Sequence, residues 1–123
     1  ELLWSTGDAA AVVTPQVATS SLVRRALKSL ELALSEPFSA GRLARSLGVT
    51  PSHLSRAFCK ELGIPPVRWV QQRRMELARW LLTRTTQPVK EVAAACGMGD
   101  AQWFNKAVRR HFGMSPSALR SDR

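Results

Sequence analysis

The chain has 123 residues, of which 45% are hydrophobic, and its formal net charge is +9. This length allows one compact domain or two very small ones, and the apolar content excludes a disordered polyelectrolyte. The basic residues all lie beyond residue 20, whereas the residues before them include Glu1 and Asp8. A folded chain with this excess of positive charge favours a polyanionic partner, although a basic surface can also serve solubility alone.

Several other classes of protein are not expected. Cys59 and Cys96 are isolated from each other and from histidine, so neither a zinc site nor another metal site is predicted. Two separate thiols favour a reducing cytoplasm. No apolar run reaches the roughly 18 residues of a membrane span, and no signal peptide is visible. We find no nucleotide-binding loop and no catalytic constellation, so no cofactor and no enzyme activity are expected.

In chain order, residues 1–19 show little periodicity and are interpreted as a linker or the tail of a missing upstream domain. Seven helices and no strand are predicted after them, so the fold class is all-α. The predicted ranges are about 21–35, 40–47, 51–62, 66–84, 88–96, 101–111 and a short helix from 116. The expected N-caps are Ser20 or Ser21, Ser39, Thr50 and Asp100. Pro51 and Pro88 are expected at the first position of their helices, where the missing N–H costs nothing.

One pattern occurs twice in the chain. The first copy comprises Leu43-Ala44, Gly48, Leu54, Arg56-Ala57-Phe58, Lys60, Leu62-Gly63-Ile64 and Pro66. The second comprises Val92-Ala93, Gly97, Phe104, Lys106-Ala107-Val108, Arg110, Phe112-Gly113-Met114 and Pro116. The offset is 49 residues up to the turn glycine and 50 after it, so the second copy has one extra residue between Gly97 and Asp100. A short helix, a glycine turn and a second helix with a basic outer face are the layout of a helix-turn-helix unit.

The second helix of each copy is the candidate reader helix. Its apolar residues recur at helical spacing, as in Leu54, Phe58 and Leu62, and leave a polar face outside. Asn and Gln can bond adenine edges, and Arg and Lys can bond guanine. Such faces can also be ordinary solvated helix surfaces. Two of them in register favour DNA.

The chain resembles the DNA-binding domain of the AraC/XylS family of bacterial transcription regulators over about residues 21–120. The resemblance rests on the run Val89 to Pro116 and on Arg74, Ala78 and Leu81-Leu82. Met98 and Val108 depart from it, since the family usually has Phe at both positions. The implied fold is homeodomain-like: two helix-turn-helix subdomains, 20–63 and 86–123, joined by a long linker helix in 64–85. At about 1.5 Å per residue that helix is roughly 28 Å long, close to the roughly 34 Å of one DNA turn.

The resemblance implies sequence-specific binding of double-stranded promoter DNA, with the two reader helices in adjacent major-groove segments. The base-reading positions map to Ser52, Ser55, Arg56, Ala101, Gln102, Asn105 and Lys106. Phosphate contacts are expected from Thr50, His53, Lys60, Arg109 and Arg110. The family also implies contact with RNA polymerase and an upstream effector-binding or dimerisation domain. Three alternatives remain: a nonspecific nucleoid or RNA-associated protein, an enzyme or its appendage, and a protein-interaction domain.

Three tryptophans are predicted to have structural roles or none. Trp69 belongs to the apolar stripe of the linker helix, with Val67 and Val70, and is expected in the core. Trp103 is expected to be a half-buried support of the second reader rather than a base-stacking residue. Trp80 is expected to be exposed without a defined role.

Overall fold

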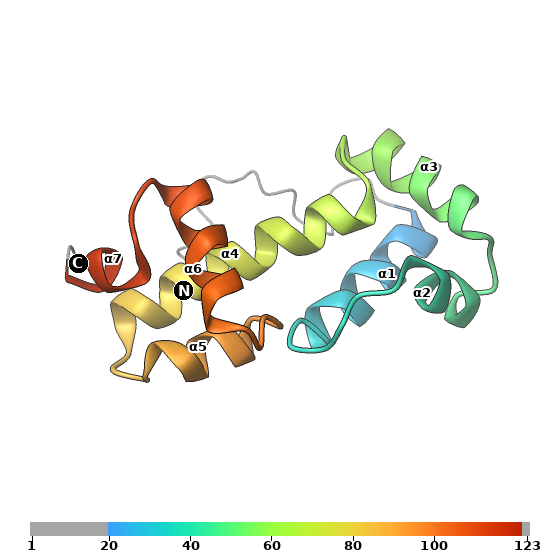
Figure 1. Cartoon of the computed structure of the whole chain (residues 1–123). Helices are drawn as coiled ribbons and strands as arrows, with labels where there is room; N and C mark the ends of the chain where they lie inside the picture. Colours follow the sequence, from blue (N-terminus) through green and yellow to red (C-terminus); the bar gives the residue numbers. More distant parts are fainter. Residues whose placement is uncertain (1–19, 122–123) are drawn as a thin grey trace. The chain divides into compact units, whose positions relative to one another are not determined.

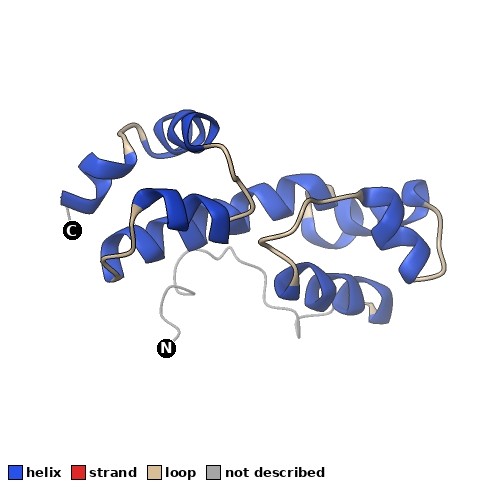
Figure 2. Ribbon diagram, turned by 60° about the horizontal axis from the view of Figure 1, so that its bottom comes forward, coloured by secondary structure: helices blue, strands red, loops and turns tan. Residues whose placement is uncertain are grey.

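A computed structural model describes residues 20–121, so the linker or tail predicted for residues 1–19 lies outside the described residues. The described part is entirely helical, with seven helices and no strand, which confirms the all-α prediction (Figures 1 and 2). The helices are α1 (Ser21–Leu32), α2 (Ala40–Ser46), α3 (Pro51–Leu62), α4 (Pro66–Arg84), α5 (Val89–Ala95), α6 (Ala101–Phe112) and α7 (Pro116–Ser121).

Side-chain caps start four of these helices where the sequence predicts them. The side-chain oxygens of Ser20, Ser39, Thr50 and Asp100 accept backbone N–H hydrogen bonds at 2.9–3.2 Å from the first turns of α1, α2, α3 and α6. These bonds satisfy backbone donors that have no partner within the helix. The starts of both reader helices, α3 and α6, are therefore fixed by hydrogen bonds between residues that are close in the sequence.

Two predicted helix boundaries are wrong: the end of α1 by about three residues and the start of α5 by one. α1 ends at Leu32, because the chain then turns tightly and the N–H of Glu36 donates to the carbonyl of Ala33 at 3.0 Å. Pro37 disfavours helical backbone at the residue before it, which prevents the helix from continuing. Pro88 is the N-cap of α5 rather than its first helical residue, since its ψ of 146° is extended.

The chain divides into two compact units. Among the described residues, the first unit comprises the chain up to Leu32 together with Ser39–Val67. In this unit α3 packs against α1 and α2 (Figure 1). Its buried apolar residues come from all three helices: Val23, Ala26, Leu27, Leu30, Leu43, Ala44, Leu54 and Phe58.

The second unit comprises Ala33–Phe38 and the chain from Arg68 onward. Here α6 packs against α5 and α7. Residues of α4 to α7 and of the turn before α6 form its core: Met75, Ala78, Leu82, Val92, Ala93, Cys96, Met98, Phe104, Val108 and Leu119.

The apolar stripe predicted for the linker helix is partly wrong. Val67 is exposed and Trp69 is only half-buried, whereas Met75, Ala78 and Leu82 are buried. Of Val67, Trp69 and Val70, only Val70 is buried, so the prediction holds for one of these three residues. Trp80 is exposed, as predicted.

Candidate nucleic-acid interface

The sequence repeat is a structural repeat. α2 and α5 each have 7 residues, and α3 and α6 each have 12. The turn glycines Gly48 and Gly97 have φ of 77° and 79°, and Gly63 and Gly113, which end the reader helices, have φ of 84° and 81°. Side chains with a Cβ rarely adopt this left-handed backbone, which explains why glycine recurs at these positions.

The extra residue of the second copy is Gly99. The residue after each turn glycine, Val49 or Met98, donates its N–H to a carbonyl of the preceding helix, at 3.0 or 2.8 Å. The α3 cap follows Val49 directly, whereas Gly99 separates Met98 from the α6 cap. The two turns are therefore equivalent up to Met98 and differ only in the approach to α6.

The two reader helices are exposed in the same pattern. Residues 51–60 and 101–110 have the same degree of burial at each of the ten positions. Phe58 and Phe104 have no exposed surface. All predicted base-reading and phosphate-contacting residues are exposed except Ser55 and Asn105, which are half-buried. In each unit, the predicted contact residues therefore lie together on or beside the outer face of one reader helix, α3 in the first unit and α6 in the second.

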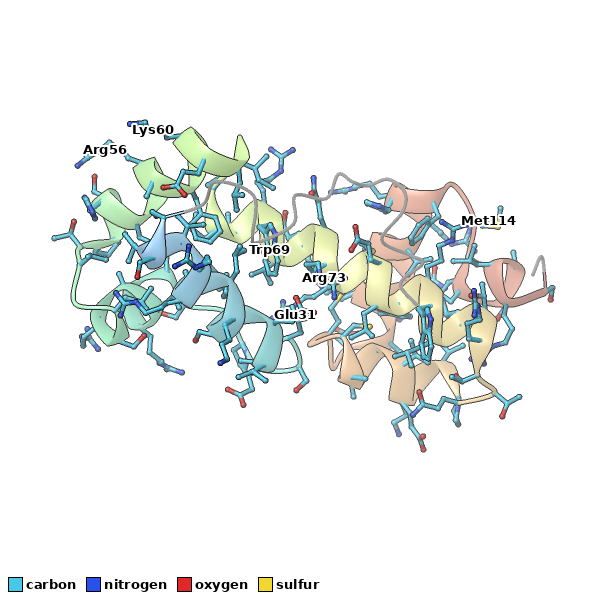
Figure 3. All side chains as sticks on the ribbon, turned by 180° about the vertical axis from the view of Figure 1, so that it is seen from behind. Glu31, Arg56, Lys60, Trp69, Arg73 and Met114 are labelled. Carbon is cyan, nitrogen blue, oxygen red and sulfur yellow. The ribbon has the colours of Figure 1, made fainter. Side chains whose placement is uncertain are left out.

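Two hydrogen bonds hold predicted contact residues in place. On α3, Arg56 Nη1 donates to Ser52 Oγ at 2.9 Å. Figure 3 shows Arg56 and Lys60 projecting from the outer side of this helix. On α6, Arg109 Nε donates to Asn105 Oδ1 at 2.7 Å. Both bonds restrict long or adaptable side chains before any ligand arrives, which lowers the entropic cost of binding.

The charge on the reader helices is positive. α6 contains no acidic residue, and its last turn carries Arg109, Arg110 and His111. On α3 the one acidic side chain, Glu61, is half-buried, and its Oε1 accepts the N–H of Ser20 at 2.7 Å. An acid-free outer face attracts phosphate and does not repel a duplex.

Trp103 differs from its predicted role as a half-buried support, since 62% of its surface is exposed. Phe104 and Val108 occupy the inner side of α6, and Trp103 is turned away from them by its position on the helix. Its counterpart in the first copy is His53, which is also exposed. The signal in the sequence is the repeat register, because it pairs Trp103 with His53, for which an exposed phosphate contact is predicted.

The two cysteines lie in different surroundings. Cys96 is buried, and this burial raises the pKa of its thiol to about 12, so the thiol stays protonated. Cys59 is an exposed thiol on α3. Within residues 20–121, no cluster of His, Cys, Asp and Glu could hold a metal ion. In the same range, no helix is both long and apolar enough to cross a membrane.

Comparison with known proteins agrees with this geometry. The family profile of a helix-turn-helix domain matches residues 43–122. A helix-turn-helix-type transcriptional regulator of Mycobacterium tuberculosis is 38% identical over 80 residues, which are 65% of this chain and 31% of that protein. The arabinose operon regulatory protein of Escherichia coli is 31% identical over 84 residues, which are 68% of this chain and 29% of that protein. The chain therefore spans about a third of the length of these relatives.

Solved structures share the fold. The C-terminal domain of AraT, a response regulator from Geobacillus stearothermophilus, has a TM-score of 0.82 and 33% identity, and the match covers 86% of this chain and 88% of that one. The DNA-binding domain of AdpA, a global transcriptional factor solved in complex with a target DNA, has a TM-score of 0.75 and 29% identity, with coverage of 85% and 93%. Together with the duplicated helix-turn-helix unit, these matches show that the chain belongs to the AraC-type helix-turn-helix family of transcription regulators.

Proposed function

We propose that this chain binds double-stranded promoter DNA sequence-specifically, with α3 and α6 each entering a major-groove segment. The observation that carries this proposal is the structural repeat of two reader helices whose outer faces expose the same positions and no acidic side chain but the half-buried Glu61. The target DNA bound to the DNA-binding domain of AdpA supports the same use of the fold here.

The two readers contribute unequally to base recognition. On α6, Gln102, Asn105 and Lys106 offer amide and ammonium groups that can bond base edges, and Ala101 can contact a thymine methyl. On α3, Arg56 is the main reader, because Ser52 and Ser55 are short. α6 is therefore the more discriminating helix.

Phosphate contacts position the two readers. Thr50, His53, Lys60, Arg109 and Arg110 are all exposed and lie at the starts of the reader helices or toward their basic ends. Exposed Trp103 adds an apolar contact to sugar or to a thymine methyl at the edge of the α6 interface.

The whole protein extends beyond this DNA-binding chain. Its relatives are about three times longer than the matched region, which supports an upstream effector-binding or dimerisation domain. Contact with RNA polymerase and a cytoplasmic location complete the proposal. The chain itself carries no catalytic role in this proposal, since the reader faces bind rather than transform their ligand.

Selection from random duplexes at two salt concentrations tests this function. A specific binder enriches one sequence, and its preference over scrambled DNA persists or grows as salt suppresses the phosphate contacts common to all duplexes. Equal affinity for enriched and scrambled duplexes at both salt concentrations would instead indicate a nonspecific nucleoid or RNA-associated protein.

A further inference from the structure

The second compact unit includes a segment from much earlier in the chain than its helix-turn-helix helices. Residues Ala33–Phe38 follow α1 in the chain, yet they pack with the chain from Arg68 onward. Leu34 of this segment is buried. The second unit is therefore completed by residues that precede the first helix-turn-helix turn in the sequence.

Arg74 of α4 binds this segment through its guanidinium group. Its Nε donates to the carbonyl of Leu34 at 3.1 Å, and its Nη2 donates to the carbonyl of Glu36 at 2.6 Å. The planar fork of arginine can reach two carbonyls at once, which the single ammonium of lysine cannot do with the same geometry. Burial lowers the pKa of Arg74, as expected for a guanidinium withdrawn from water.

The same contact reaches the turn before α6. A Cβ placed on Gly97 would lie 2.6 Å from the Leu34 carbonyl oxygen and 2.8 Å from Cζ of Arg74. The backbone of Gly97 therefore lies directly against both partners of the Arg74 hydrogen bond. At the equivalent Gly48 of the first copy, a Cβ would meet nothing within 4 Å.

We propose that Arg74 is a positioning residue for the second reader: it clamps the segment Ala33–Phe38 onto the Gly97 turn and so fixes the start of α6. Only Met98 and Gly99 separate Gly97 from Asp100, the cap of α6. Met98 is buried and its N–H donates to the carbonyl of Ala93 at 2.8 Å, so the position of Gly97 is passed on to the start of α6, where Gln102 and its neighbours lie. This inference rests on the proposed function for its DNA readout.

The first test compares two matched glycine variants, Gly97→Ala and Gly48→Ala. Both place a Cβ at nearly the same positive φ, so the backbone strain is common to both. Only Gly97→Ala also collides with Leu34 and Arg74. We expect discrimination at the base pairs read by α6 to fall about tenfold in Gly97→Ala, with little change in Gly48→Ala, because a small misplacement of a reader is costly. Equal effects of the two variants on those base pairs would overturn the clamp.

The second test uses Arg74→Ala and Arg74→Lys at a temperature where each variant is folded, with affinities normalised to the active fraction. The base pairs read by α6 are those whose preference is lost in Lys106→Ala, and those read by α3 are lost in Arg56→Ala. We expect Arg74→Ala to reduce discrimination at the α6 base pairs alone, and Arg74→Lys to restore it only in part. The proposal is contradicted if a folded Arg74→Ala protein keeps native preference at the base pairs read by α3 and at those read by α6. It is also contradicted if preference is lost equally at the two sets of base pairs.

A third measurement needs no DNA. Amide hydrogen exchange of Arg74→Lys should quicken in residues 33–38 and also in residues 97–103, relative to the native chain. Exchange that quickens only in residues 33–38 would show that Arg74 does not act on the α6 turn. A native chain without any sequence preference would refute the proposed function, whereas this exchange experiment would still test the clamp.

Discussion

At the level of single residues, the proposed contacts with DNA bases come from the outer faces of α3 and α6. Lys106 is exposed on α6, in a position equivalent to Arg56 on α3. Both have long basic side chains that can reach guanine O6 and N7. Arg56 donates to the Ser52 hydroxyl rather than to a carboxylate.

We expect Lys106→Ala to weaken binding to the preferred duplex by about 1–3 kcal/mol and to relax the preference at one base step. The measurement is a titration of labelled duplexes that differ at single base pairs. Lys28→Ala, which removes an exposed charge on α1, is the control and should leave the base preference intact. An unchanged preference in Lys106→Ala would remove this residue from the reader assignment.

Arg109 and Arg110 are neighbours with different surroundings, and we expect their variants to differ. Arg110→Ala should weaken all duplexes alike and lower the slope of log K against log salt by about 1, since it removes one phosphate contact. Arg109→Ala removes the partner of Asn105 as well, so it should also reduce the preference at the base pair that Asn105 reads. Salt titrations on the preferred and a scrambled duplex measure both effects. Identical behaviour of the two variants would mean that the Arg109–Asn105 bond does not organise base reading.

Sequence reasoning located most of these side chains because the repeat and the helical period both place them outside. It failed at Trp103, where the neighbouring Phe104 suggested an inner position although the register with His53 indicated an outer one. It also gave Arg74 no contact role, since its hydrogen bonds to Leu34 and Glu36 span 40 and 38 positions. No periodicity within one helix can predict a contact between such distant segments.

At the scale of helices, the caps and glycine turns decide where each reader begins and ends. Asp100 accepts the N–H of Gln102 at 2.9 Å and that of Trp103 at 3.4 Å, and its carboxylate also suits the positive end of the α6 dipole. These cap residues were predictable because capping is local in sequence. The early end of α1 was not, because it depends on the fold of the segment that follows.

We expect Asp100→Ala to lower the free energy of unfolding by about 1 kcal/mol, because α6 loses the acceptor for its first N–H groups. Asp100→Asn is the matched variant, and it should lose less than half as much because Asn keeps an oxygen acceptor. Urea unfolding followed by circular dichroism measures the difference. Equal losses in the two variants would show that the carboxylate charge rather than the cap bond stabilises α6.

For the whole chain, we propose that two readers act on one duplex with unequal discrimination. Family membership and the structural repeat establish the two helix-turn-helix units. We infer the division of base reading between α3 and α6 from their exposed side chains. α6 offers Gln102, Asn105 and Lys106, whereas α3 offers mainly Arg56.

The most direct test determines base preference at every position of the selected duplex for the native chain, Arg56→Ala and Lys106→Ala. We predict that the two variants lose preference at different base steps, each within one of two separate segments, and that the segment affected by Lys106→Ala is the more selective. Loss at the same base step in both variants, or no preference in the native chain, would contradict two separate readers of unequal selectivity.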